Sequence, residues 1–325
     1  IITGDFVTTE DGTGIVHTAP TFGADDAKVA ADAGVPGLLV LDEKGNPVPL
    51  VDLQGKFTSN MGEFAGQYVK NEYYNDGEAP EKSVDVEIAI KLKIENKAFK
   101  VEKYTHSYPH CWRTDKPILY YPLESWFIKT TAYKDRMVEL NKTIQWKPEA
   151  TGTGRFGNWL ENLVDWNLSR SRFWGTPLPI WRTADGTEEK CIGSIAELQA
   201  EIDQAVAAGF MTASPYAGKE LDLHRPYVDE VILLSPKGQK MFRETDLIDV
   251  WFDSGAMPYA QWHYPFENKD IFEANFPADY IAEGVDQTRG WFFTLHALSV
   301  MLFDSVSFKN VIANGLVLDK NGNKM

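Results

Sequence analysis

Short apolar runs separated by polar, glycine-containing turns dominate residues 1–103, which is typical of short strands. Glycine-bounded apolar runs predict strands at residues 14–17 and 37–41, and the second run ends in a turn over residues 44–47. Residues 24–33 instead predict a short helix, because two aspartates fall in its first turn and a glycine follows its end. These residues together predict a β-rich domain that also carries a short helix.

From Tyr104 onwards the sequence is rich in aromatic residues and prolines. The C-terminal part of the chain predicts a parallel sheet. Residues 279–282 predict a buried strand, which passes through a glycine turn at 283–286 into an apolar helix at 291–303. Residues 311–313 predict the next strand. A strand, a helix and a strand in this order form a βαβ unit, whose two strands run parallel.

Residues 182–245 interrupt that pattern and predict an insertion. Ser194 and Glu197 form a capping-box signature at the start of a helix. Apolar residues at helical spacing follow it: Ile195, Leu198, Ile202 and Ala205. Residues 231–234 predict a strand.

Length, charge and cysteine content limit the possible functions. The 325 residues allow about two domains, and we expect them at residues 1–103 and 104–325. The net charge of −15 argues against general coating of nucleic acid, although it leaves room for a local basic patch. Two cysteines make no disulfide framework and favour a reducing, cytoplasmic compartment. The longest apolar run, at residues 291–303, is too short to span a bilayer.

The sharpest chemical motif is EGVDQTRGWF at residues 283–292, which lies at the carboxyl end of a predicted strand. Ligands bind at that position in open α/β sheets. Carboxylate and amide side chains there can bond ribose hydroxyls or an ammonium group. The alternative is that Glu283 and Asp286 only cap the following helix, and the residues alone leave both interpretations open.

Three further motifs are weaker when taken alone. DVWFDSG, at residues 249–255, predicts a strand that ends in a tight turn, and a purely structural role is its alternative. WNLSRSRFWGTPLP, at residues 166–179, places two arginines among aromatics, which could hold phosphate or RNA backbone or form a structural stack. Lys324, in the loop at residues 321–325, could reach a phosphate, although most such lysines are only solvated.

Together these motifs resemble the isoleucyl-tRNA synthetases of class I over essentially the whole chain. That family carries WNxSRxRxWGxPxP, DVWFDSG and GxDQxRGWF in this order, followed by a KMSKS loop that would begin at Lys324. The resemblance implies an α/β fold, namely the second half of a Rossmann-like, parallel-sheet catalytic domain with an inserted, β-rich editing domain (a partial β-barrel). The family's HIGH signature lies upstream of the matching part, so we expect an internal fragment.

The resemblance also implies roles for individual residues. The residues expected to hold the isoleucyl-adenylate are Glu283, Gly284, Asp286 and Gln287. Among them, the glycine and the glutamine would lie against the ribose. Trp251 and Trp291 would wall the isoleucine side-chain pocket, and Lys324 would stabilise the ATP phosphates in the transition state.

Residues 11–26 resemble the family's editing site, which hydrolyses valine mischarged onto isoleucine tRNA. A hydrophobic pocket rejects a side chain that lacks one methylene by only about 1–3 kcal/mol, a limit for which the isoleucyl enzymes are a standard example. Asp26 would grip the α-ammonium group of the substrate, and His17 would help to place the attacking water. The alternatives are a structural histidine and an aspartate that only complements the helix dipole.

Zinc is not expected, although many bacterial members of the family bind it through paired cysteines. Cys111 stands at one expected position, whereas Thr114 occupies the position of its partner. Structural zinc sites require four Cys or His ligands. His106 and His110 are separated by Pro109, which argues against a helical metal pair.

The expected function is therefore that of an isoleucine-tRNA ligase, whose intact form uses isoleucine, ATP with Mg²⁺ and tRNA(Ile), with no membrane and as a monomer. We expect this chain alone to be inactive in aminoacylation, because the two halves of the nucleotide fold need each other. Two alternatives are a free-standing deacylase that edits tRNA in trans and a non-catalytic RNA-binding module. The deacylase would not need the catalytic-domain sequence, and the binding module would not need the adenylate-site residues.

Overall fold

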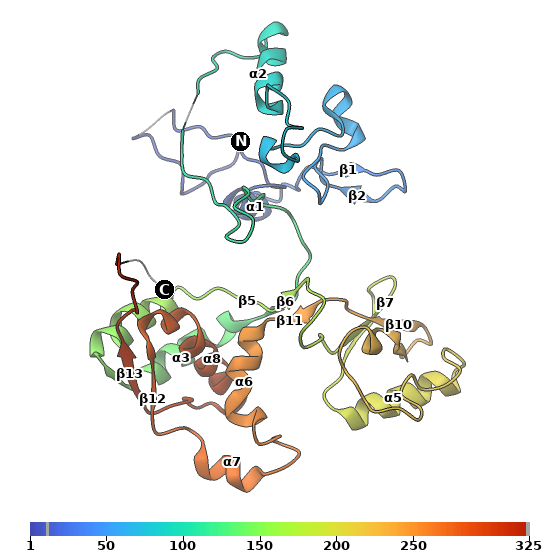
Figure 1. Cartoon of the computed structure of the whole chain (residues 1–325), viewed down its shortest axis with the longest axis vertical. Coiled ribbons are helices and arrows are strands. Elements are labelled where there is room, and N and C mark those ends of the chain that lie inside the picture. The colour runs from blue at the N-terminus through green and yellow to red at the C-terminus, as the bar shows by residue number, and fades with distance from the viewer. Residues whose placement is uncertain (11–12, 104, 323–325) are drawn as a thin grey trace. The chain divides into compact units, whose positions relative to one another are not determined.

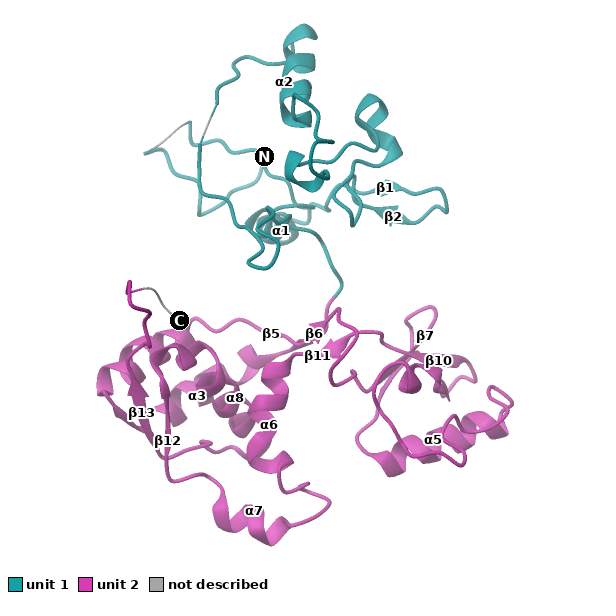
Figure 2. Cartoon of the chain, in the orientation of Figure 1, with its two compact units in different colours: residues 1–124 teal, residues 125–325 magenta. Residues whose placement is uncertain are grey.

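Residues 1–10, 13–103 and 105–322 are described by the computed structural model, and they fall into two units. Unit 1 runs from Ile1 to Glu124 and unit 2 from Ser125 to Met325 (Figure 2). Both units mix helices with short strands, so the chain is a mixed α/β protein (Figure 1). Within the described ranges, no helix is long and apolar enough to cross a bilayer.

Unit 1 is built from short elements joined by turns (Figure 1). These are α1 (Ala24–Asp32), the hairpin β1 (Val40–Leu41) and β2 (Pro47–Val48), the 3-10 helices η1 (Ser59–Phe64) and η2 (Asn71–Tyr73), and α2 (Val84–Ile94). Helix α1 confirms the predicted helix, and the antiparallel hairpin turns where the sequence predicted a turn.

Unit 1 contains less strand than the sequence predicted. Residues 14–17 form no ladder with any described part of the chain, and the strand expected at 37–41 is reduced to the two residues of β1. A strand forms only where a neighbouring segment completes its backbone hydrogen bonds, and an apolar run in one segment does not specify such a neighbour. The strand expectation is wrong at these places, and the β-rich editing domain stays a prediction.

The segment from residue 105 to Glu124 packs with unit 1. The hydroxyl of Tyr73 donates to the carbonyl of Pro117 at 2.7 Å, and the hydroxyl of Tyr121 donates to the carbonyl of Val51 at 3.0 Å. Unit 1 therefore extends past residue 103.

Unit 2 contains the predicted βαβ arrangement. Strand β12 (Ile281–Gly284) leads through the 3-10 turn η6 (Val285–Arg289) into helix α8 (Trp291–Phe303), and the chain returns as β13 (Asn310–Asn314). Strands β12 and β13 are parallel, and β4 (Gln145–Lys147) continues the sheet in parallel on the other side of β13. The expected parallel sheet is confirmed.

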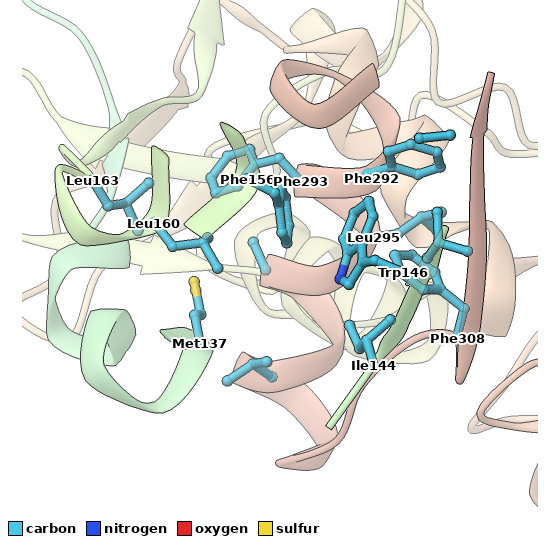
Figure 3. Packing of buried hydrophobic residues seen from close by; sticks show 14 residues of the cluster. Met137, Ile144, Trp146, Phe156, Leu160, Leu163, Phe292, Phe293, Leu295 and Phe308 are labelled. Carbon is cyan, nitrogen blue, oxygen red and sulfur yellow. The ribbon is translucent and has the colours of Figure 1, made fainter. Parts of the chain in front are cut away.

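The core of unit 2 forms around α8, which is apolar on all sides and buried from Phe292 to Val300. Trp146 of β4 packs edge-on against Phe292, with 5.5 Å between the ring centroids, and Phe308 lies beside both (Figure 3). Met137, Phe156 and Leu160 are fully buried in the same core, and the centroid of the Phe156 ring lies 5.0 Å from that of the Trp146 ring (Figure 3). This packing fixes the start of α8, and so the η6 turn that precedes it.

The insertion forms a small module with a core of its own. Strands β7 (Ile180–Thr183), β8 (Glu189–Cys191), β9 (Ile232–Leu234) and β10 (Lys240–Arg243) make an antiparallel sheet in the order β8-β7-β10-β9. Helix α5 (Ile195–Ala207) buries Leu198, Ile202 and Ala205.

The predicted capping box at the start of α5 is confirmed. The Ser194 hydroxyl accepts a hydrogen bond from the backbone N–H of Glu197 at 3.1 Å, and the Glu197 carboxylate accepts one from the backbone N–H of Gly193 at 2.7 Å.

Helix α6 (Val250–Ala260) corrects the prediction of a strand and turn at residues 249–255. Strand β11 (Leu247–Ile248) ends before Asp249, whose carboxylate accepts a hydrogen bond from the backbone N–H of Trp251 at 3.2 Å and so caps the helix. A short apolar run does not by itself distinguish a strand from a helix. Helix α6 packs along α8 (Figure 1).

The remaining elements of unit 2 connect these parts. Two short antiparallel pairs join β3 (Phe127–Ile128) to β5 (Trp166–Asn167) and β6 (Ser169–Arg170) to β11. The other helices are η3 (Thr130–Tyr133), α3 (Lys134–Asn141), the π-helix η4 (Thr151–Phe156), α4 (Gly157–Glu161), η5 (Tyr227–Glu230) and α7 (Lys269–Asn275).

Candidate functional site

The turn between β12 and α8 carries four of the predicted site residues. Glu283 and Gly284 end the strand, and Asp286 and Gln287 lie in η6; all four are half-buried. The carboxylate of Glu283 has no hydrogen-bond partner among the described residues. It lies at the carboxyl end of a parallel strand, which is where α/β sheets bind ligands.

Gln287 caps helix α8. Its side-chain Oε1 accepts a hydrogen bond from the backbone N–H of Trp291 at 2.9 Å. The sequence left open whether Glu283 and Asp286 have only a capping role, and the capping bond at Trp291 comes from Gln287 instead. This leaves its amide nitrogen, which lies 3.5 Å from an Asp286 carboxylate oxygen, as the polar group that a ligand can reach.

Hydrogen bonds made by Thr288 and Arg155 hold the same turn in place. Thr288 is fully buried, and its hydroxyl donates to the carbonyl of Val285 at 2.8 Å. The Nε of Arg155 donates to the Thr288 hydroxyl oxygen at 2.8 Å. Sequence reasoning missed Arg155, because the contact spans 133 positions of the chain and no local pattern indicates it.

The two expected pocket tryptophans both lie at this turn. Trp291 begins α8, and its indole N–H donates to the carbonyl of Ser254 in α6 at 2.9 Å. Trp251 lies in the first turn of α6, and a Cβ placed on Gly290 would come 3.2 Å from its ring atom Cη2. The structure thus brings both indoles together with Gln287 around Gly290, where a Cβ would also come 2.6 Å from the Gln287 amide oxygen.

A cavity of about 330 Å³ opens beside Trp291, between α6, α7, α8 and β12. Its walls include Met257, Tyr280, Ile281 and Leu295, and Trp251 does not line it. A larger and mostly apolar cavity of about 490 Å³ lies between α5 and the loop of His263 and Phe266. None of the predicted site residues lines the larger cavity, so we centre the candidate site on the η6 turn.

The two arginines of the WNLSRSRFW motif have different surroundings. Arg170 forms a 2.7 Å ion pair with the buried carboxylate of Asp249, so it is a structural arginine. Arg172 is exposed, and its side chain contacts no partner in the described part of the chain. Sequence reasoning missed Asp249 as a site-forming residue, although an aspartate followed by a helix is a typical N-cap.

The editing candidates lie in unit 1. His17 is exposed, and Asp26 is half-buried in the first turn of α1. One carboxylate oxygen of Asp26 accepts a hydrogen bond from the backbone N–H of Ala19 at 2.9 Å. Asp11, Gly12 and Lys324 lie outside the described residues.

The expected zinc position lacks a second cysteine, and Thr114 interacts with the sulfur of Cys111 instead. The hydroxyl of Thr114 and nearby backbone N–H groups lower the pKa of the Cys111 thiol. Over residues 1–10, 13–103 and 105–322, no group of three or more His, Cys, Asp or Glu side chains is arranged to hold a metal ion.

Comparison with known proteins gives three findings. The family model for class I tRNA synthetases (I, L, M and V) matches residues 42–325. An isoleucine-tRNA ligase of Cytophaga hutchinsonii is 70% identical over 335 residues, which cover 100% of this chain and 30% of that protein. An isoleucine-tRNA ligase of Bacteroides fragilis is 62% identical over 356 residues, with 100% of this chain and 31% of that protein covered. This chain therefore spans about a third of the length of the curated relatives that it matches.

Proposed function

Because the chain belongs to the class I tRNA synthetases (I, L, M and V), we propose that it is part of an isoleucine-tRNA ligase and carries half of its adenylate site. Two relatives with that activity match the whole chain at 62% identity or more. The observation that carries the proposal is the convergence of Trp251, Trp291 and Gln287 around Gly290. Two indole faces next to a polar turn suit a branched aliphatic side chain joined to a nucleotide.

The reaction of the intact ligase has two steps. The carboxylate of isoleucine attacks the α-phosphate of ATP, which gives isoleucyl-adenylate and releases pyrophosphate. A hydroxyl of the terminal ribose of tRNA(Ile) then attacks the carbonyl carbon and releases AMP. Mg²⁺ would enter with ATP as part of the substrate.

In this chain, the turn residues would bind rather than react. The residues assigned to the adenylate are Glu283, Gly284, Asp286 and Gln287. The free Glu283 carboxylate suits the α-ammonium group through a charge-assisted bond, and the amide nitrogen of Gln287 suits a ribose oxygen. Trp251 and Trp291 would wall the isoleucine side chain, and Lys324 would stabilise phosphate charge.

We further propose that residues 1–103 belong to an editing domain and that residues 104–325 form the second half of the catalytic domain, although the segment from residue 105 to Glu124 packs with unit 1. His17 and Asp26 would act in hydrolysis of valine from mischarged tRNA(Ile). The ligase would work in the cytoplasm as a monomer without zinc. Tight, stoichiometric zinc in metal analysis of the purified chain would contradict the last point.

Calorimetry with a sulfamoyl analogue of isoleucyl-adenylate tests the adenylate site. We expect saturable binding of one analogue per chain and no aminoacylation by the chain alone. Trp251→Ala should weaken binding at least tenfold, which corresponds to about 1.4 kcal/mol. The matched control is Trp174→Ala, since Trp174 is an exposed indole that stacks on His224 away from the turn.

Two results would count against the proposal. Absence of binding at millimolar analogue would refute the adenylate site. Binding of valyl-tRNA(Ile) with release of valine, but without analogue binding, would instead favour the free-standing deacylase.

A further inference from the structure

We propose that the ion pair between Arg170 and Asp249 is a positioning device for Trp251 and so tunes the selectivity of the amino-acid pocket. The effect on selectivity rests on the proposed function, whereas the positioning of Trp251 does not. Arg170 comes from the WNLSRSRFW motif and Asp249 from DVWFDSG, so the pair joins two motifs that look independent in the sequence.

Asp249 is held from four directions. Its side chain is only 6% exposed. One carboxylate oxygen accepts hydrogen bonds from Arg170 at 2.7 Å and from the indole N–H of Trp166 at 3.1 Å. The other accepts the backbone N–H of Trp251 at 3.2 Å, while the backbone N–H of Asp249 donates to the carbonyl of Leu168 at 2.7 Å. The aspartate therefore has one well-defined position.

Arg170 is also held by hydrogen bonds on its own side. Its Nη1 donates to the carbonyls of Asn167 and Ser169, both at 2.9 Å. Strand β6, which carries Arg170, pairs with β11, the strand that leads into α6. The guanidinium is thus anchored to backbone carbonyls of β5 and β6, while its charge holds Asp249, the first residue after β11.

A hydrogen bond couples the position of Asp249 to that of Trp251. The bond from the Trp251 backbone N–H fixes the first turn of α6, and the Trp251 ring then rests against Gly290. Loss of the arginine leaves a buried carboxylate without its counter-charge, which is strongly unfavourable. The carboxylate would turn towards solvent, release the Trp251 N–H and let the first helical turn fray.

A small movement of Trp251 is enough to change selectivity. A hydrophobic pocket separates side chains that differ by one methylene by only about 10–200-fold. A radial gap of about 0.5–1 Å already removes a quarter to a half of a van der Waals contact. Isoleucine, which would fill the proposed pocket more completely than valine, would therefore lose more affinity than valine when the indole shifts.

The first experiment is ¹⁹F NMR of the whole chain labelled with 5-fluorotryptophan, with the Trp251 signal assigned by Trp251→Phe. We expect Arg170→Met and Asp249→Asn to shift or broaden that signal. Arg170→Lys, which keeps the charge but loses the fork of donors, should have an intermediate effect. Arg172→Met is the matched control and should leave the signal unchanged. An unchanged Trp251 signal in folded Arg170→Met and Asp249→Asn would overturn the positioning role.

The second experiment measures the affinity of each variant for sulfamoyl analogues of isoleucyl- and valyl-adenylate. We expect Arg170→Met to reduce the preference for the isoleucyl over the valyl analogue by about threefold to tenfold, which is part of the discrimination that one methylene provides. Arg172→Met should keep this preference. Equal weakening of both analogues would refute the selectivity claim. No binding by the unchanged chain would refute the proposed function, and the ¹⁹F result would still decide whether the pair positions Trp251.

Discussion

The indole N–H of Trp291 donates to the one carbonyl of α6 that Pro258 leaves without a helical partner. In an α-helix the carbonyl of Ser254 would bond the backbone N–H of residue 258, and proline has none. Trp291 supplies the missing donor from α8 at 2.9 Å. A tryptophan assigned to the pocket is thus also part of the hydrogen bonding of the neighbouring helix.

This relationship predicts that Trp291→Phe destabilises the chain by about 0.5–1.5 kcal/mol beyond the change in packing, because a solvent-exposed hydrogen bond to the Ser254 carbonyl is lost. The measurement is urea unfolding. Pro258→Ala restores a helical N–H at that position. In this background, Trp291→Phe should cost about 1 kcal/mol less, and strictly additive effects would contradict the relationship.

Gly255 allows α6 and α8 to approach closely. A Cβ at Gly255 would lie 2.9 Å from the carbonyl carbon and oxygen of Thr294, which are backbone atoms and cannot give way cheaply. Gly255→Ala should destabilise the chain by about 1–3 kcal/mol and weaken binding of the isoleucyl-adenylate analogue. The control is Gly154→Ala, since that position has open space around it. Equal unfolding midpoints for the two variants would show that the helices separate freely.

The burial of His296 predicts that the stability of the chain depends on pH. It is completely buried in α8, its Nε2 donates to the carbonyl of Met137 at 2.9 Å, and burial lowers its pKa to about 4. The unfolded chain therefore binds this proton first as the pH falls. The stability contribution is fully present above about pH 6.5, and about 3 kcal/mol of it is lost by pH 4.

Urea unfolding between pH 7 and pH 4 measures this effect. His296→Gln should flatten the loss of stability in that window, whereas His263→Gln, at an exposed position, should not. The same slope in His296→Gln as in the unchanged chain would assign the loss to other groups.

Asp26 is predicted to have two separable roles. Its carboxylate accepts the backbone N–H of Ala19, and it is proposed to bind an α-ammonium group. Asp26→Asn keeps an acceptor oxygen for Ala19 but removes the charge, so it should weaken binding of a non-hydrolysable valyl-adenosine while keeping the melting temperature. Asp26→Ala should lower both, the stability by about 1 kcal/mol. Unchanged binding in Asp26→Asn would remove the ammonium role.

Local patterns predicted the elements whose signals are local. Helices α1 and α5 begin where acidic residues or a capping box indicate, and the βαβ order predicted the parallel pair β12 and β13. The prediction of a strand at residues 14–17 was wrong, because a strand depends on a neighbouring segment that its own sequence does not specify.

Helix α6 could not be predicted from its own residues. Gly255 and Pro258 both disfavour a helix interior, and the structure offsets each through α8. The glycine lets α8 come close, and Trp291 replaces the donor that the proline lacks. Likewise the Arg170 and Asp249 pair bridges 79 positions, and no local spacing indicates it. The helix is thus a product of tertiary contacts that override local propensity.

The capping bond of Gln287 has a chemical consequence for what the turn can recognise. Its amide oxygen accepts the backbone N–H of Trp291, which orients the side chain so that its amide N–H group can donate to an incoming molecule. A ligand group that bonds this N–H must offer a lone pair. A sugar in which that oxygen is replaced by an ammonium or a methyl group should be rejected there, even where its size and shape are unchanged.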